Sequence, residues 1–512
     1  MTRRKVKTSA AVFLVCLGLT GIAPAQQEAA ATDPNASPPG AVTFRTGTEL
    51  VQVDVIVQSH GTPVDDLMKD DFTLTDNGEP QTISVFNLRR AEPVAGPRDP
   101  LPPGVVTNQR IAEGRSPLAA TVILLDFLNS EPGDAARAIQ QAIDYLEHSE
   151  LTEYVAIYSL NQTVVRLHDF TTNREELLAV LRKTKAQQTP GFRAQSVYFE
   201  QRRRSGMVRS AFFTLARYLK GIPGRKKLVW IGGGIPMTAK GEKNRLAIFS
   251  EYYRFAPILE APIAILNDAN VGVYPIDTAG LNRNLNDNTL ATMNFFAGNT
   301  GGKAIYGISQ RVIGKAIDEV MRDTEVTYTL GFYVTSDAKQ GDHDLRVRVN
   351  RGGVNVRYRR GYTAEPAPEP LDADARFKTL SAWMVEPLDA TEIVLRAAAA
   401  PTPDQPGSFD VTVAVDPASL DLELAEDRWL DVIDVAIIPD TGDAPVGMHQ
   451  SINLNLQQET YLQDLKTGIL IQRRVSAVDR KGRLESDKLR VGVVDGASGK
   501  VGTVRVPIAL PE

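Results

Sequence analysis

The sequence predicts an α/β protein in which a doubly wound, mostly parallel sheet is flanked by an N-terminal and a C-terminal β domain. Between residues 119 and 321, short apolar runs alternate with segments of helical periodicity, a pattern typical of parallel sheets covered by helices. Before and after this block, apolar residues recur at every second position, as in half-buried strands. The 512 residues, 43% apolar and 23% charged, suffice for about three globular domains.

Residues 1–25 have the pattern of a secretory signal peptide. Basic residues at positions 3–7 precede an apolar run over 10–22, and Ala23-Pro24-Ala25 offers small residues for cleavage before Gln26. The alternative is a retained membrane anchor, although this run is short for a bilayer. We therefore expect an exported, secreted or periplasmic protein with no transmembrane segment in the mature chain.

Cysteine and charge exclude several classes of function. Cys16 is the only cysteine, and it lies inside the predicted signal peptide, so the mature chain should have no disulfide, cysteine-bound zinc or cysteine nucleophile. Removing the four N-terminal cations from the net charge of −5 gives −9. This acidic balance argues against a nucleic-acid-binding protein.

Residues 44–90 are predicted to form the N-terminal β domain, after a flexible linker over 26–43. Four valines between 51 and 57 share one face of a strand. Further along, Asn77-Gly78 is a hairpin signal between strands at 72–75 and 82–86. A proline-rich linker over 91–118 follows.

The α/β domain is predicted over residues 119–364. The apolar run 121–125 ends at Asp126 and is typical of a central parallel strand. Further strands are expected at residues 154–158, 227–231 and 271–276. Helices are expected at residues 134–148, 207–219, 258–269, 290–297 and 312–321. Strands at 328–333, 345–349 and 354–358 are expected to close this domain.

A linker over 365–376 and a C-terminal antiparallel β-sandwich over 377–512 complete the predicted organisation. Strand-like segments recur here between turn signals such as Arg480-Lys481-Gly482. These segments cover residues 409–415, 429–438, 451–456, 467–479 and 489–494.

Several short motifs occur in an order that resembles a known family. They are Val64-Asp65-Asp66-Leu67, Asp76-Asn77-Gly78, Leu124-Leu125-Asp126 with Asn129, Asp169-Phe170-Thr171, Gly224-Arg225-Lys226-Lys227, Val273-Tyr274-Pro275-Ile276-Asp277, Thr300-Gly301-Gly302, Tyr328-Thr329-Leu330-Gly331 and Arg360-Gly361-Tyr362. Over residues 44–364 the chain resembles the VWFA-related exported proteins of Acidobacteria, and its central block resembles a von Willebrand factor type A domain. The resemblance implies the fold and the export signal, but no substrate.

The resemblance also implies a place for a divalent cation, at the carboxyl end of the sheet. Type A domains often bind the ion through Asp-x-Ser-x-Ser, a threonine and a second aspartate. Here Asp126 and Ser130 match, whereas Leu128 replaces the first serine and would put an apolar side chain towards the ion. Gly232 stands where the second acid is expected. We therefore predict an impaired metal site formed by Asp126 and Ser130, with magnesium affinity in the millimolar range or weaker, and no resident cofactor.

Three assignments at this edge stay open in the sequence. Thr189 is either the threonine ligand or an ordinary loop residue, and Asp277 is either a substitute acid or a turn carboxylate. Asp126 is either a ligand or a cap for loop amides. The predicted binding edge comprises Asp126, Asn129, Ser130, Thr189, Gly232, Gly233 and Asp277.

No catalytic constellation is visible elsewhere in the sequence. The five histidines lack zinc-site spacing, and there is no Gly-x-Ser-x-Gly elbow. Residues 182–209 carry a net charge of +7, which indicates either a solvated surface or a docking surface for an acidic partner or an anionic envelope polymer. Our first hypothesis is a non-catalytic protein-interaction module. The alternatives are a structural protein that binds peptidoglycan or another envelope polysaccharide, and an enzyme using the Asp126 edge.

Overall fold

The structure is a computed structural model, and its description begins at Thr48, within the compact unit Gly47–Glu512. It describes residues 48–90, 101–109, 119–149, 151–185, 197–236, 238–240, 252–278, 288–306, 313–335, 340–364, 369–403, 405–441, 447–478 and 482–509. The predicted signal peptide, the linker 26–43 and Thr189 lie outside these residues.

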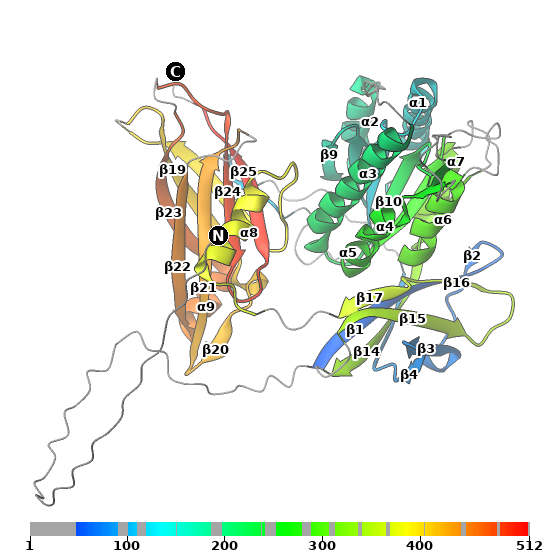
Figure 1. Ribbon diagram of the computed structural model, residues 1–512. Coiled ribbons are helices and arrows are strands. Elements are labelled where there is room, and N and C mark those ends of the chain that lie inside the picture. Colours follow the sequence, from blue (N-terminus) through cyan, green and yellow to red (C-terminus); the bar gives the residue numbers. More distant parts are fainter. Residues whose placement is uncertain are drawn as a thin grey trace, which may run out of the picture. The chain divides into compact units, whose positions relative to one another are not determined.

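The central sheet has five strands in the order β13-β10-β7-β8-β9. Two of them, β9 and β10, are labelled in Figure 1. Strand β7 is parallel to β8 and β10, β10 is parallel to β13, and β9 runs antiparallel to β8. The bounds are β7 Ala119–Asp126, β8 Tyr154–Leu160, β9 Val164–Thr171, β10 Arg225–Gly232 and β13 Val271–Asp277. Every residue of β8, β10 and β13 is buried, as continuous apolar runs indicate. The predicted mostly parallel α/β sheet is confirmed.

Helices cover both faces of this sheet. One apolar cluster contains buried residues of α1, α2 and α7, and a second contains buried residues of α3, α4, α5 and α6. The helices span α1 Pro132–His148, α2 Arg174–Lys183, α3 Val197–Lys220, α4 Ala256–Glu260, α5 Pro262–Asp268, α6 Asn288–Thr300 and α7 Ile313–Arg322. The single helix expected over 258–269 is two short helices, because Pro262 has no N–H to continue the first one.

The strands predicted to close the α/β domain instead pair with the N-terminal β strands. Strand β1 is antiparallel to β14, with Val53 opposite Leu330, and β3 is antiparallel to β15. The two sheets have the orders β16-β1-β14-β5 and β17-β15-β3-β4, with β2 beside β1. Their bounds are β1 Thr48–Ser59, β2 Thr62–Pro63, β3 Phe72–Asp76, β4 Glu79–Gln81, β5 Val85–Arg90, β14 Val326–Thr335, β15 Gly341–Val349, β16 Asn355–Arg357 and β17 Gly361–Ala364.

The predicted division into a β domain over 44–90 and an α/β domain over 119–364 therefore does not match the pairing, because β14 and β15 pair with strands of the N-terminal segment. The chain leaves this β unit at Arg90, builds the α/β domain and returns at Val326. The physical reason is burial: the valine face of β1 needs an apolar partner, and Tyr328, Leu330 and Phe332 supply it in one shared core. Residues this far apart leave no pairing signal in a single sequence.

Two antiparallel sheets form the C-terminal region. The first has the order β23-β19-β18-β6, and the second has the order β22-β21-β24-β25, with β20 also beside β21. Buried residues of both sheets belong to one apolar cluster. Bounds are β6 Val106–Thr107, β18 Leu395–Pro401, β19 Ser408–Val415, β20 Glu423–Ala425, β21 Arg428–Pro439, β22 Met448–Gln457, β23 Ile469–Ser476, β24 Lys488–Asp495 and β25 Val501–Pro507; helix α9 spans Gln458–Thr467.

Two predicted linkers contain ordered structure. Strand β6, from the expected linker 91–118, pairs with β18, and the buried Asn108 side chain donates to the carbonyl oxygens of Ala390 and Ile393, both at 2.8 Å. Helix α8 (Ala373–Met384) begins inside the expected linker 365–376, where the Asp372 carboxylate caps it. Among the residues described, no helix combines the length and the apolar character needed to cross a membrane.

Candidate functional site

Three neighbouring strands end together at the carboxyl edge of the central sheet. Strand β7 ends at Asp126, β10 at Gly232 and β13 at Asp277, and Gly232 lies opposite Asp277 in the parallel ladder. This placement is the one predicted from the apolar runs that precede each residue. Open α/β sheets bind ligands outside the carboxyl ends of their strands, so this edge is the first place to look for chemistry.

The Asp126 carboxylate is buried, with 1% of the residue exposed, and both of its oxygens accept hydrogen bonds. Oδ1 accepts from the Asn129 backbone N–H at 3.0 Å, and Oδ2 accepts from Asn129 Nδ2 at 2.8 Å. The Trp230 indole N–H, on β10, donates to Oδ2 at 2.9 Å. Burial raises the pKa of Asp126, and these hydrogen bonds partly oppose the rise. Asp126 therefore holds the loop and the neighbouring strand together.

Sequence reasoning missed Trp230 as part of this site. A tryptophan in a fully buried strand must find an acceptor for its indole N–H, and this was the available signal. Its ring also packs edge-on against Phe212 and Phe296, with centroids 5.2 and 6.0 Å away. The indole is therefore fixed by packing as well as by Asp126.

The Asp126 loop is held by further contacts. Ser130 Oγ accepts a hydrogen bond from the Gly233 backbone N–H at 3.2 Å. The expectation that the Leu128 side chain points towards an ion is wrong, because it is 2% exposed and belongs to the apolar core beneath the sheet. The Leu128 carbonyl oxygen accepts from Arg204 on α3 at 3.0 Å.

Position 232 has no room for a second acid. A Cβ atom on Gly232 would lie 2.7 Å from the Asp126 Cβ, which is closer than real Cβ contacts. Asp277 is buried, with 2% exposure, and its backbone N–H donates to the Ile305 carbonyl oxygen at 2.9 Å. The glycine thus lets β10 approach β7 closely at the point where Trp230 reaches Asp126.

The oxygen atoms of Asp126 and Ser130 at this edge accept hydrogen bonds from neighbouring N–H groups. A divalent cation prefers several oxygen ligands, and Asp126 Oδ2 already accepts from two N–H groups, whereas Asp126 Oδ1 and Ser130 Oγ accept from one each. Within the described part of the chain, no group of three or more His, Cys, Asp or Glu residues is arranged to hold a metal ion.

A second cluster, which the sequence did not predict, joins three strands of the β unit. His343 Nδ1 lies 2.8 Å from both Asp76 carboxylate oxygens, and the Tyr362 hydroxyl donates to Asp76 Oδ2 at 2.9 Å. The His343 and Tyr362 rings stack at 4.6 Å. All three residues are buried, so this cluster clasps β3, β15 and β17 rather than facing a substrate.

The basic stretch 182–209 is partly neutralised within the chain. Glu200 accepts hydrogen bonds from both Arg203, at 2.9 Å, and Arg204, at 2.7 Å. Arg182 pairs with Glu147 at 2.7 Å. Glu200 is already counted in the net charge of +7, so only the pair of Arg182 with Glu147 lowers the excess, and both interpretations stay open.

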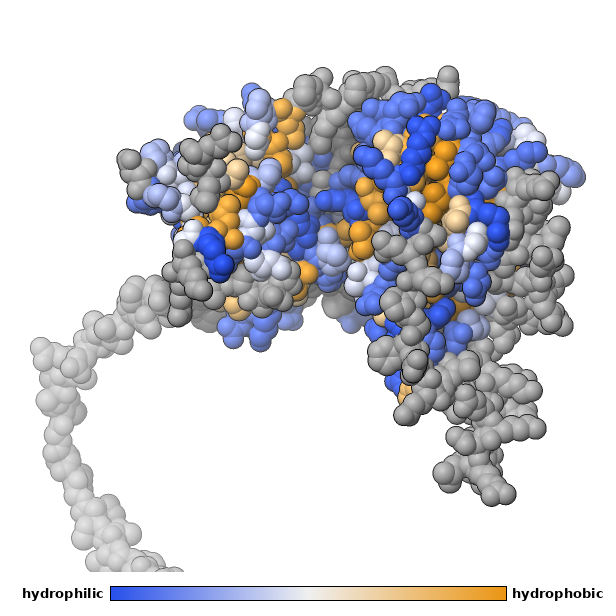
Figure 2. Space-filling view, turned by 90° about the horizontal axis from the view of Figure 1, so that it is seen from above, coloured by the Kyte–Doolittle hydropathy of each residue, from blue (hydrophilic) through white to orange (hydrophobic). Residues whose placement is uncertain are grey.

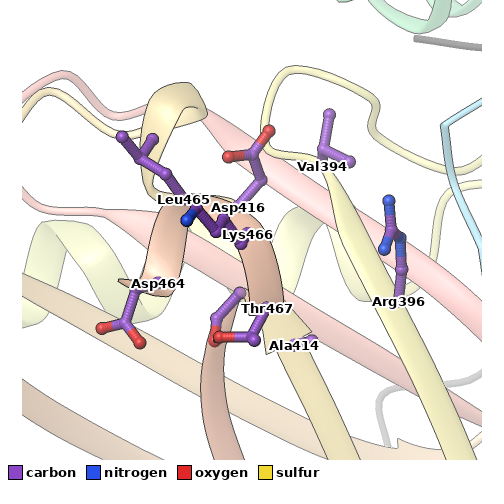
Figure 3. A pocket seen from close by; sticks show the side chains of 9 residues that line it. Val394, Arg396, Ala414, Asp416, Asp464, Leu465, Lys466 and Thr467 are labelled. Atoms are coloured by element: carbon purple, nitrogen blue, oxygen red, sulfur yellow. The ribbon is translucent and has the colours of Figure 1, made fainter. Parts of the chain in front are cut away.

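The C-terminal sheets carry a small hollow of about 60 Å³ (Figure 3). Residues of β18, β19 and α9 contribute to its lining, but the carboxylates of Asp416 and Asp464 point in different directions. Asp416 is also used locally, because its side chain accepts from the Ala418 backbone N–H at 2.9 Å. The hollow has room for roughly two water molecules and brings no reactive groups together.

Comparison with known proteins gives structural likenesses alone. No protein-family model matches the chain, and no curated protein matches it. An aerotolerance-related membrane protein from Bacteroides fragilis is 11% identical over 40% of this chain and 98% of its own, with a TM-score of 0.26. The vWF domain of the type V pili tip protein Mfa5 from Porphyromonas gingivalis is 12% identical over 40% and 94%, with a TM-score of 0.25. The PilB minor pilin from Streptococcus sanguinis is 12% identical over 42% and 62%, with a TM-score of 0.27.

Proposed function

We propose that this chain is an exported, non-catalytic interaction protein. Its α/β domain is of the von Willebrand factor type A kind, its C-terminal sheets pack as a β-sandwich, and its carboxyl edge binds a protein partner without a metal ion. The sheet order β13-β10-β7-β8-β9 and the motifs at the strand ends support the type A assignment. The basic and apolar N-terminal pattern supports export.

The observation that carries the proposal is the buried Asp126 carboxylate. An acid that serves catalysis or a metal needs an oxygen that the ligand can reach, whereas Asp126 is 1% exposed and already accepts hydrogen bonds from Trp230 and Asn129. A catalytic site also needs a base or nucleophile with an orienting partner, and the described residues of this edge supply neither. What this edge offers is a rigid rim of polar loop residues.

The surface agrees with recognition through polar contacts. On the face seen in Figure 2, hydrophobic residues form separate streaks between wider hydrophilic areas. Glu131, which precedes α1, is exposed beside the Asp126 loop. A partner bound at this edge would therefore meet polar loop side chains, as at a non-obligate protein interface.

The test is site-specific photo-crosslinking of the mature chain in envelope extract. A photoreactive residue at Glu131 reports the carboxyl edge, and the matched control replaces Glu325, an exposed acid at the start of β14. We expect Glu131 to capture a protein that Glu325 does not, equally with magnesium and with EDTA.

Three results would contradict the proposal. They are capture that requires magnesium, capture of peptidoglycan or another polysaccharide in place of protein, and equal capture from both positions. Export is tested separately by N-terminal sequencing of the mature protein, which should begin at Gln26.

A further inference from the structure

The sheet edges of this protein differ in how they are protected from strand addition. An edge strand exposes unpaired N–H and C=O groups, and proteins usually guard them with charge, proline, bulges or short length. Strand β5 carries Arg89 and Arg90, and β23 carries Arg473 and Arg474. Strand β9 contains charged residues and two register shifts against β8.

The remaining edges described are guarded in the same ways. Strand β13 contains Pro275, whose carbonyl oxygen already accepts from the Ile305 N–H. Strand β25 contains Arg505 and ends at Pro507. The other described edge strands, apart from β22, have four residues or fewer.

Strand β22 is the exception among the described strands. It has ten residues, its only strand partner is β21, and it contains no Lys, Arg, Asp, Glu or Pro. Its one ionisable side chain, His449, lies with Nε2 3.0 Å from Asp434 Oδ2. Its exposed residues are His449, Gln450, Ser451, Asn453, Asn455 and Gln457.

We propose that β22 is an association edge on which β22 of a second copy of this chain pairs in antiparallel orientation. This inference is independent of the Asp126 edge and of the proposed function. Antiparallel self-pairing centred on Ile452 or Asn453 places each outward residue opposite another outward residue, because side chains alternate along a strand. The β22 side chains that then face each other include no Lys, Arg, Asp or Glu, and the two arginines that reach this strand, Arg428 and Arg473, donate to Asn455 and Gln450.

The burial of apolar side chains also favours β22 of a second copy as the strand that pairs here. Met448, Ile452 and Leu456 contact the core between the two sheets but are only partly buried. In either self-paired register, inward residues of one copy lie beside inward residues of the other, so each copy covers the other's apolar margin. Such a pair uses the same strand in both copies, so the assembly is a closed dimer. A strand from another protein would need an alternation of apolar and polar residues that matches β22.

The expected dimer is weak. One strand pair is small against the roughly 1,200 Å² that stable interfaces bury, so dissociation in the micromolar range is expected. The test is sedimentation velocity of the mature chain between about 1 and 300 µM. We expect a monomer–dimer equilibrium that Asn453→Lys weakens at least about tenfold, because two lysines face each other or lie close across the axis.

A matched variant controls for the added charge. Asn87→Lys places the same charge on an exposed residue of β5, an edge already guarded by arginines, and should leave association unchanged. Circular dichroism should show that both variants are folded like the wild type.

Disulfide trapping reads the register directly, because Cys16 is the chain's only cysteine and the mature chain should lack it. For a centre at Asn453, Asn453→Cys should form a disulfide dimer, since opposite Cα atoms lie about 4.5–5.5 Å apart. For a centre at Ile452, a mixture of Ser451→Cys and Asn453→Cys should cross-link. Gln457→Cys should not cross-link in either register. A monomer at every concentration, or equal cross-linking at all three positions, would overturn the proposal.

Discussion

Replacing Asp126 by alanine tests whether this residue is a structural acceptor or a metal ligand. The substitution leaves the Trp230 indole N–H and the Asn129 backbone N–H without their acceptor in a buried site. Each unsatisfied buried donor costs about 1–3 kcal/mol, so we expect Asp126→Ala to lower the free energy of unfolding by roughly 3 kcal/mol. Asp126→Asn keeps one acceptor oxygen, but its NH₂ faces either the Trp230 indole N–H or the Asn129 backbone N–H, so one of these two donors loses its acceptor. The expected loss for this variant is about 1 kcal/mol.

The measurement is urea unfolding followed by tryptophan fluorescence. The chain has three tryptophans, so replacing Trp383 and Trp429 by phenylalanine makes Trp230 the only reporter. The loss caused by Asp126→Ala should be the same with magnesium and with EDTA. A stoichiometric magnesium site of micromolar affinity that Asp126→Ala abolishes would refute the structural interpretation and point to Asp277 as the missing acid.

The pH dependence gives an independent check on the same residue. Burial raises the pKa of Asp126 above its unfolded value, so the folded state holds the proton more tightly. The stability contribution is therefore full below the unfolded pKa, about 4, and is lost as the pH rises towards the folded pKa. Asp126→Asn should lack this decline. A bound cation would stabilise the carboxylate, so that the free energy of unfolding would rise with pH instead of falling. That result would also refute the structural interpretation.

Two further predictions concern buried charges away from the edge. Burial lowers the pKa of Lys226 to about 7 despite nearby Asp54 and Asp268. The free energy of unfolding of the wild type should therefore rise by roughly 4 kcal/mol between about pH 7 and pH 10. In urea unfolding, Lys226→Met should lack this rise. Burial and the neighbouring Asp495 raise the pKa of Asp431 to about 7, so wild-type stability should fall between about pH 4 and pH 7. Because the Asp431 side chain is partly exposed, we expect a fall of about 2 kcal/mol, absent in Asp431→Asn; equal pH slopes for the two proteins would contradict this.

The fold was predictable where local pattern decides it. The apolar runs that end at Asp126 and Asp277 gave the right strands, and their place between helices gave the right parallel edge. The partner of β1 was not predictable, because its match with β14 joins residues nearly 280 positions apart, such as Val53 and Leu330. Loop-closure entropy rises only slowly with length, so such insertions cost little and leave no local signal.

The candidate site was also predictable only in part. Leu128 and Gly232 have no side-chain oxygen, and the impaired metal site inferred from them stays a prediction. The direction of the Leu128 side chain was wrong, because facing the core removes more apolar surface from water than facing the edge. Trp230 was missed because its acceptor lies on another strand, 104 positions away.

Strand β10 is fixed at both ends, and this bears on how its carboxyl edge can act. At the amino end, the buried Lys227 Nζ lies 2.9 Å from Glu153 Oε1 and donates to the Met321 carbonyl oxygen at 2.7 Å. At the carboxyl end, Trp230 donates to Asp126. Moving β10 along its axis would break a buried charge pair at one end, at a cost of about 3–5 kcal/mol. At the other end it would leave a buried donor unsatisfied, at a cost of about 1–3 kcal/mol. If the proposed partner binds at this edge, it would meet a preorganised surface, and its affinity would depend on fit more than on rearrangement.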